Sequence, residues 1–234
     1  MRALLLPVKD LRNSKQRLVN LLTPEERFEL AQAMLADTFR AVMDVRNADK
    51  IFVVTNYAPV MQAARENGWE ILAEDQQISE SASVDSASRQ CEALGVRSLL
   101  RLPLDLPLVQ TGDIDELLAI ECATPGMVIV PSRDGTGTNA ILRTPPTLFP
   151  SHFGPGSFAK HCAEAEHCSA QIIIRRNLRL EMDIDDESDL RALLQYDLSE
   201  TATAALLQRT DLLSRLQSRA FESLKTPAAV PQQR

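Results

Sequence analysis

The sequence is poor in aromatic residues, which make up 4% of its 234 positions, and it has no excess of positive charge. Its 25 Lys and Arg residues face 32 Asp and Glu residues, so the formal net charge is −7. Proteins that bind nucleic acid need a basic groove and stacking rings, so nucleic acid is not an expected partner. No apolar run approaches the roughly 20 residues that cross a bilayer, so no membrane association is expected either.

Signals for export are also lacking. The apolar start of the chain ends at Pro7 and is followed by Lys9 and Asp10, which makes it too short for a signal peptide. We therefore expect a cytoplasmic protein whose four cysteines are reduced thiols. The length suits one large domain or two small ones, and the 44% of hydrophobic residues suits an ordinary globular core.

Short apolar runs alternate with helical patterns along most of the chain. The first helix has a clear start, because Thr23 can cap it, Pro24 suits its first turn and Glu26 can complete a capping box. Strands are expected at 3–8, 50–55, 69–72, 98–103, 127–130, 138–143, 171–174 and 178–182. Helices are expected at 24–43, 59–67, 83–94, 114–120, 157–165, 186–194 and 203–221.

This alternation predicts an α/β fold with a mainly parallel sheet flanked by helices. We expect one domain over residues 1–198, a C-terminal helix over 199–222 and a disordered tail over 223–234. The C-terminal helix either packs on its own subunit or forms the contact of a homodimer. Ligands of such sheets bind beyond the carboxyl ends of the strands, so the segments there are the place to look for a site.

A basic loop follows the first strand. Lys9, Arg12, Lys15 and Arg17 lie within nine residues, and such a cluster can cradle a triphosphate, although a solvated charged loop is the alternative. The sequence has no Walker A motif, which argues against a P-loop NTPase.

Two acidic segments could hold a divalent cation. Asp105 stands alone in the apolar stretch LPLDLPLV at 102–109, where a buried carboxylate is costly unless it is paired; a turn cap is the alternative. The run DIDDESD at 183–189 follows an expected strand, so alternation places Asp183 and Asp185 on one face. Its later acids suit the first turn of a helix. Asp185 is our choice as the second metal ligand, and a part for Asp183 stays open.

Two loops of small residues could bind an anion. Gly135, Gly137 and Ala140 match a dinucleotide fingerprint, but no long helix can follow them. The better interpretation is a loop whose backbone amides and side-chain hydroxyls bind an anion. In the second loop, Ser157 begins an expected helix, and His161 lies one turn later on the same face, where it could help to hold the anion. Plain turns and caps are the alternative for both loops.

Five segments in this order resemble the CofC/FbiD guanylyltransferases, which make the nucleotide-activated phospho-acid used for coenzyme F-420. The resemblance covers residues 2–195. The segments are PVK at 7–9 with SKQRL at 14–18, LPLDLPL at 102–108, DGTGTNA at 134–140, FGPGSF at 153–158 with His161, and DID at 183–185 before Asp189.

The resemblance implies a single-domain Rossmann-like nucleotidyltransferase fold of the GT-A type, with GTP as donor and Mg²⁺ as cofactor. It implies a metal site at Asp105 and Asp185 and catalytic roles for Lys15, Arg17 and Asp105. The acceptor-binding residues expected from it and from the patterns above are Thr138, Asn139, Gly154, Ser157 and His161. The expected nucleotide-binding residues are Pro7, Lys9, Lys15, Arg17 and Asp85.

The implied reaction moves GMP from GTP onto the phosphate of a small phospho-carboxylic acid and releases pyrophosphate, and the product would pass to the next enzyme of the coenzyme pathway. Phosphoenolpyruvate, 2-phospho-L-lactate and 3-phospho-D-glycerate all remain open as acceptors. The family often has Gly-Leu-Asn where this chain has Ser83, Val84 and Asp85, which leaves the guanine contacts open. The alternatives are another nucleotidyltransferase, of cytidylyl or molybdopterin type, and a catalytically silent nucleotide-binding protein.

Overall fold

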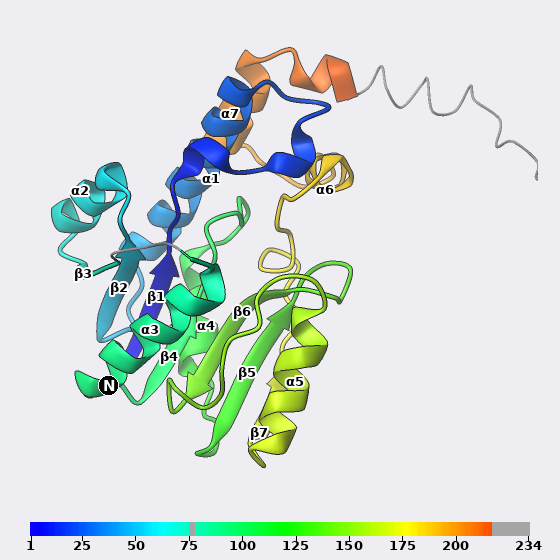
Figure 1. The fold of residues 1–234 in the computed structure, drawn as a ribbon. Helices are drawn as coiled ribbons and strands as arrows, with labels where there is room; N and C mark the ends of the chain where they lie inside the picture. The colour runs from blue at the N-terminus through cyan, green and yellow to red at the C-terminus, as the bar shows by residue number, and fades with distance from the viewer. Residues whose placement is uncertain (75–77, 217–234) are drawn as a thin grey trace, which may run out of the picture.

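A computed structural model describes residues 1–74 and 78–216 (Figure 1). Its seven strands form one sheet: β1 (Arg2–Pro7), β2 (Lys50–Thr55), β3 (Glu70–Ala73), β4 (Ser98–Arg101), β5 (Gly126–Pro131), β6 (Thr138–Thr144) and β7 (Gln171–Ile174). The helices are α1 (Pro24–Met43), α2 (Ala58–Glu66), α3 (Glu80–Ala93), α4 (Thr111–Ala119), α5 (Ser157–His167), α6 (Glu187–Leu193) and α7 (Ala202–Arg209). Two 3-10 turns, Leu11–Asn13 and Gln16–Leu18, follow β1.

The sheet has the order β3-β2-β1-β4-β6-β5-β7. The pairs β1–β2, β1–β4, β2–β3 and β5–β7 are parallel, while β6 runs antiparallel to both of its neighbours. The prediction of a mainly parallel sheet flanked by helices is therefore confirmed. The carboxyl ends of β1 and β4 lie side by side, and this arrangement brings the loops that follow them together.

Both faces of the sheet are buried, as the continuous apolar runs predict. Leu4 and Leu6 of β1 pack with α1, α2 and α4, while Ala3 and Leu5 pack on the opposite face with α3 (Figure 1). Helix α5 covers the same face as α3, over β5. The capping box of α1 is also present, since Glu26 N–H donates to Thr23 Oγ1 and Thr23 N–H to Glu26 Oε2.

The strand expected at 178–182 is absent, and this prediction was wrong. Asn177 turns the chain there, because its Oδ1 accepts from the N–H of Arg179 and its carbonyl accepts from the N–H of Glu181. Leu180 and Met182 are buried, but from a turn rather than from a strand.

The C-terminal segment packs on its own chain. Both carboxylate oxygens of Asp37 in α1 accept hydrogen bonds from the start of α7, including the N–H and hydroxyl of Thr203. The single helix expected over 203–221 is interrupted, because Thr210 is extended and ends α7 before the chain turns helical again at 212–216. Residues 217–234, with the expected tail, lie outside the described residues. No described helix is long and apolar enough to span a membrane.

Candidate active site

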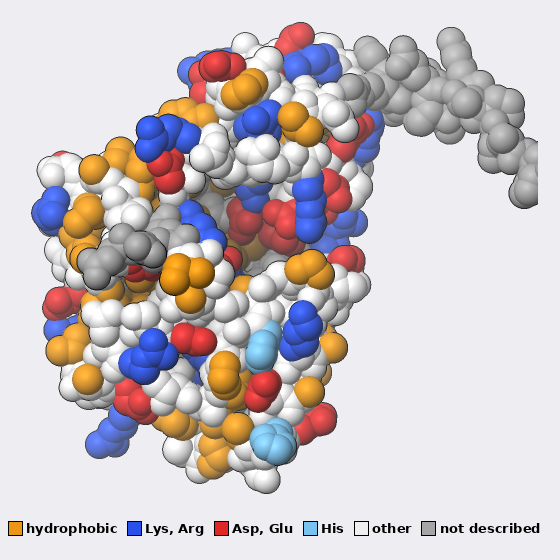
Figure 2. Space-filling view, in the orientation of Figure 1, with side chains coloured by type: hydrophobic (Ala, Val, Ile, Leu, Met, Phe, Trp, Pro, Cys, Tyr) orange, Lys and Arg blue, Asp and Glu red, His pale blue; other side chains and the backbone are white. Residues whose placement is uncertain are grey.

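The loops at the carboxyl ends of the strands surround two adjoining pockets, and Figure 2 shows acidic and basic side chains gathered in a hollow on this face. The first pocket lies between the basic loop, α3 and the segment after β4. The second lies between the loops 132–139, 153–157 and 183–189. Arg17, Glu80, Arg101, Asp105 and Asp185 are among the residues that line both pockets.

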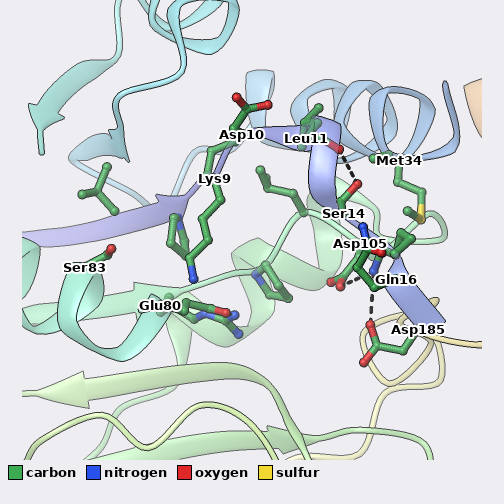
Figure 3. A pocket seen from close by; sticks show the side chains of 18 of the residues that line it. Lys9, Asp10, Leu11, Ser14, Gln16, Met34, Glu80, Ser83, Asp105 and Asp185 are labelled. Atoms are coloured by element: carbon green, nitrogen blue, oxygen red, sulfur yellow. Dashed lines mark hydrogen bonds and ion pairs between the residues drawn. The ribbon is translucent and has the colours of Figure 1, made fainter. Parts of the chain in front are cut away.

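Lys15 joins the two acids that the sequence singled out. Its Nζ lies 2.7 Å from Asp105 Oδ2 and 3.3 Å from Asp185 Oδ1, and its side chain is only 9% exposed. Figure 3 shows the carboxylates of Asp105 and Asp185 approaching one another in the first pocket. The backbone adds a direct link, because Ile184 N–H donates to the carbonyl of Asp105. The expected convergence of the two carboxylates is therefore present.

The charges of this cluster depend on one another. Burial raises the pKa of Asp105, but the adjacent Lys15 ammonium outweighs burial and holds that pKa below its usual range. Burial likewise opposes the charge of Lys15, and the carboxylates of Asp105 and Asp185 raise its pKa overall. Removing Lys15 would therefore leave the two carboxylates without their shared counter-charge, whereas removing one carboxylate leaves Lys15 paired with the other.

Asp183 and Asp185 share one side of their segment, while Ile184 between them is fully buried in the core. Asp183 Oδ1 accepts a hydrogen bond from Asn139 Nδ2 at 3.0 Å. Burial, followed by the negative charge of Asp105, raises the pKa of Asp183 to about 6. A third carboxylate thus lies at the edge of the cluster and is held there by the DGTGTNA loop.

The residues present fit a divalent cation. Asp105 and Asp185 are hard oxygen donors that already enclose a cation, the Lys15 ammonium. Within residues 1–74 and 78–216, no group of three or more acidic, His or Cys side chains is arranged as a complete metal cage. Mg²⁺ is commonly held in this way, by two carboxylates together with ligands from water or substrate.

Other residues of the basic loop reach the first pocket to different degrees. Pro7 and Lys9 both line it, and Figure 3 shows the Lys9 side chain extending toward Glu80. Arg17 is 65% exposed, and its Nη1 lies 3.4 Å from Asp185 Oδ2. Arg12 instead forms a surface pair with Asp10.

The second pocket is formed by the two small-residue loops. Thr138 and Asn139 begin β6, while Ser157 begins α5, and all three line the pocket. Gly154 has a φ of +117° and Gly156 a φ of +70°, which side chains rarely adopt, so glycine allows the sharp turn that places Ser157 there. The loops are tied together, because Phe158 N–H donates to the Thr136 carbonyl.

His161 does not reach this pocket, contrary to our expectation. Its side chain is fully buried behind Thr138, and its Nδ1 lies 3.0 Å from Thr138 Oγ1. The helical spacing from Ser157 is as predicted, but Phe149 and Phe153 pack around the ring and close it off. Any effect of His161 on a ligand must therefore pass through Thr138.

Asp85 is likewise absent from the first pocket, so the structure does not support the expected nucleotide contact. Its carboxylate accepts the N–H of Ser151 at 3.0 Å and lies 3.8 Å from the guanidinium of Arg143, which fixes the loop before α5. Ser83, two residues earlier on α3, lines the pocket instead. Its hydroxyl lies 2.9 Å from Glu74 Oε2.

Sequence reasoning missed Arg101, the last residue of β4. Its side chain is 6% exposed, pairs with Glu80, and donates to the carbonyls of Thr138 and Asn139. Its guanidinium also stacks on the Phe153 ring at 4.1 Å. A signal existed, because Arg101 is the single charged residue in the run 98–103, SLLRLP, at the sheet edge where ligands bind.

Comparison with known proteins identifies the family. The family described as guanylyl transferase CofC like matches residues 1–217. Over 191 residues the chain is 35% identical to phosphoenolpyruvate guanylyltransferase of Roseiflexus castenholzii, covering 82% of this chain and 87% of the relative. Over 192 residues it is 27% identical to 2-phospho-L-lactate guanylyltransferase of Methanothermobacter thermautotrophicus, covering 82% and 83%.

A solved structure agrees with the fold. A protein from Desulfovibrio desulfuricans G20, described as a nucleotide-diphospho-sugar transferase, superposes with a TM-score of 0.73 at 15% identity, covering 93% of this chain and 97% of the other. The predicted Rossmann-like nucleotidyltransferase fold of the GT-A type is thus confirmed. With the family match spanning the sheet and both pockets, the chain belongs to the CofC-like guanylyl transferase family.

Proposed function

We propose that this protein transfers GMP from GTP onto the phosphate of a small phospho-carboxylic acid and releases pyrophosphate. The observation that carries the proposal is the placement of Lys15 between Asp105 and Asp185, where two pockets meet. A reaction between two anions needs a place where both pockets open onto cations or a bound metal. The relatives' names, phosphoenolpyruvate and 2-phospho-L-lactate guanylyltransferase, support this choice of reactants.

GTP would lie in the first pocket with its triphosphate at the Lys15 end. Lys15 and Arg17 supply the charge for the β- and γ-phosphates, and Lys9 and Pro7 line the same pocket. Figure 3 shows Ser83 at the far end from Asp185, which makes that end the place for the base.

Glu74 is the residue of that end best suited to read guanine. Its Oε2 lies 2.9 Å from the Ser83 hydroxyl, whereas its Oε1 is buried and has no hydrogen-bond partner. Guanine presents two neighbouring donors, N1–H and the 2-amino group, and a carboxylate accepts both; adenine has no such pair. This assignment replaces the expected contact with Asp85.

The acceptor acid would occupy the second pocket. Thr138, Gly154 and Ser157 offer a hydroxyl, a loop backbone and the N-terminus of α5 to its anionic groups. Arg17, Arg101 and Arg133 are the cations that line this pocket. Asn139 also lines it, but its Nδ2 donates to Asp183 and to the Leu180 carbonyl, so we assign it to positioning the acidic segment.

In the proposed reaction an oxygen of the acceptor phosphate attacks the α-phosphorus of GTP in line, the bond to the β-phosphate oxygen breaks, and pyrophosphate leaves. The acceptor phosphate is already ionised near neutral pH, so no general base is required, and no covalent enzyme intermediate forms. Lys15 and Arg17 stabilise the charge that develops on the leaving group. Asp105 and Asp185 would hold Mg²⁺, which when bound supplies charge neutralisation between the phosphates.

Membership of the family implies a place in coenzyme F-420 biosynthesis, so the product would pass to the next enzyme of that pathway. We further propose a cytoplasmic location.

The test is a panel of reactions with Mg²⁺. GTP, CTP, ATP and UTP are each incubated with phosphoenolpyruvate, 2-phospho-L-lactate and 3-phospho-D-glycerate, and the products are weighed by mass spectrometry. We expect a guanylylated acid with an equal amount of pyrophosphate, from GTP and at least one of the acids. Transfer from CTP instead would indicate a cytidylyltransferase, and nucleotide binding without any transfer would indicate a silent relative.

A further inference from the structure

The two ring nitrogens of His161 have different partners, and both contacts lie in the interior. Nε2 accepts the backbone N–H of His152 at 2.9 Å, and Nδ1 lies 3.0 Å from Thr138 Oγ1. The side chain is fully buried. Phe153 meets the ring edge-on with centroids 5.1 Å apart, and Phe149 lies on another side at 6.0 Å. The ring is therefore held in one orientation.

These contacts fix the position of the ring proton. A backbone amide can only donate, so Nε2 must present its lone pair to His152 and carries no hydrogen. The histidine is neutral, because burial and then the positive charge of Arg143 lower its pKa to about 3. A neutral imidazole has one N–H, which must then be at Nδ1. Nδ1–H consequently donates to Thr138 Oγ1.

The consequence falls on the hydroxyl of Thr138. Since its oxygen accepts from His161, its own hydrogen is directed away from the ring, and Thr138 lines the second pocket. We infer that His161 is a positioning residue that sets the Thr138 hydroxyl as a hydrogen-bond donor to an anionic oxygen of the acceptor acid. In the opposite tautomer, Nδ1 would accept a hydrogen bond from the Thr138 hydroxyl, and Thr138 would present an oxygen lone pair to the anion.

The inference rests on the proposed function for the nature of the acceptor, but the tautomer stands on the structure alone. It explains why a histidine that cannot touch the ligand lies one helical turn after Ser157 in α5. It also connects the two loops of the second pocket, because His161 joins Thr138 at the start of β6 to His152 in the segment before α5.

The first test is spectroscopic and needs no activity. Nitrogen chemical shifts of histidine side chains distinguish a protonated from an unprotonated ring nitrogen, and the chain has only three histidines. The variants His152→Gln and His167→Gln assign the signals by their loss. For His161 near pH 7 we expect a protonated Nδ1 and an unprotonated Nε2. A protonated Nε2, or a doubly protonated ring, would overturn the inference.

The second test compares two substitutions of similar polarity. In His161→Asn the amide nitrogen can take the place of Nδ1 and donate to Thr138, whereas in His161→Gln the amide lies at the place of Nε2. We expect the KM for phosphoenolpyruvate to stay within about threefold in His161→Asn and to rise at least about tenfold in His161→Gln, as for a lost hydrogen bond to a charged group. The KM for GTP should not change in either variant.

Thr138→Val removes the hydroxyl, and it therefore serves as the background in which the effect of His161→Gln is measured again. If His161 acts through the hydroxyl, His161→Gln should add no further rise in KM once that hydroxyl is gone. Equal effects with and without the hydroxyl would assign His161 a merely structural part. If the wild-type protein transfers nothing, the proposed function fails; calorimetric binding of phosphoenolpyruvate then replaces KM in the same comparison, and the nitrogen shifts still decide the tautomer.

Discussion

Lys15 Nζ lies 2.7 Å from Asp105 Oδ2, although the two residues are 90 positions apart in the chain. Their strands explain the meeting: β1 and β4 are parallel neighbours, so the loops after their carboxyl ends share one edge of the sheet. Lys15 itself has a left-handed backbone, with a φ of 53°, between two 3-10 turns. The ammonium thus occupies the place where the proposed reaction needs a cation.

Lys15→Met should make the fold depend on divalent cations. Without the ammonium, Asp105 and Asp185 repel one another and only the exposed Arg17 still pairs with Asp185, so we expect a loss of about 2 kcal/mol in the free energy of unfolding. Because a divalent cation can replace the lost charge, Mg²⁺ should raise the melting temperature of this variant more than that of the wild type. Thermal unfolding with Mg²⁺ and with a chelator measures both. A melting temperature of the variant that does not respond to Mg²⁺ would mean that the carboxylates do not bind the ion.

Arg101→Lys should impair the acceptor half of the site. Lysine keeps the charge but cannot reproduce the fork that contacts Glu80 and the carbonyls of Thr138 and Asn139. We expect kcat/KM for the acceptor acid to fall about 10- to 100-fold, as measured by pyrophosphate release. The matched variant Arg40→Lys lies outside both pockets and should keep wild-type values. A wild-type rate in Arg101→Lys would remove Arg101 from the site.

Glu74→Gln should relax the preference for guanine. The change leaves one acceptor where the carboxylate offers two, so we expect about a tenfold rise in the KM for GTP. Inosine triphosphate lacks the 2-amino group, and the preference for GTP over it should shrink in the variant. Glu70→Gln is the control, because Glu70 begins the strand β3 that Glu74 directly follows but is paired with Lys50 at the surface. An unchanged ratio of the two nucleotides would place the base elsewhere.

The burial of His161 predicts a loss of stability in acid. Its pKa is about 3 in the folded protein against 6.5 when unfolded, so below pH 6.5 the unfolded chain binds a proton that the folded one does not. The stability that neutral His161 contributes is therefore fully present above pH 6.5 and is lost as the pH falls toward 3. At pH 5 the free energy of unfolding is lower by about 2 kcal/mol for this reason.

His161→Asn lacks this titration, which makes it the matched comparison. At pH 8 the variant should be the less stable protein, and the difference in the free energy of unfolding should narrow by about 2 kcal/mol at pH 5. Urea unfolding at both pH values measures the difference, and the rise in the pKa of Asp183, which acts in the opposite direction, cancels because both proteins share it. A constant difference would show that the pKa of His161 is the same in the folded and in the unfolded protein.

The sequence was informative where one local pattern determines the structure. Apolar runs predicted the seven strands that are present, and the lone Asp105 in an apolar segment predicted a carboxylate that needs a partner, which in the structure is Lys15. In the structure, β1 and β4 are parallel neighbours, and this arrangement brings Lys15 next to Asp105.

The sequence was uninformative where tertiary contacts determine the local structure or the direction of a side chain. Leu180 and Met182 have the spacing of a strand, yet the side chain of Asn177 closes a turn there. Asp85 lies on the correct helix but faces Ser151 instead of the pocket. The helical spacing of His161 gave its face correctly, while its burial depends on how Phe149 and Phe153 of the loop before α5 fold over the ring.

If Lys15, Asp105 and Asp185 form a site for attack on the α-phosphorus of GTP, the α- and γ-phosphorus atoms must end in different products, and a phosphorus label follows each of them. With α-labelled GTP and phosphoenolpyruvate, the label should appear in the guanylylated acid, and with γ-labelled GTP in pyrophosphate. Asp105→Asn should lower both about 10³-fold while keeping its melting curve, and Asp211→Asn, an exposed acid paired with Arg215, should lower neither. Label from the γ-position in the acid, or full transfer by Asp105→Asn, would show that these three residues do not form such a site.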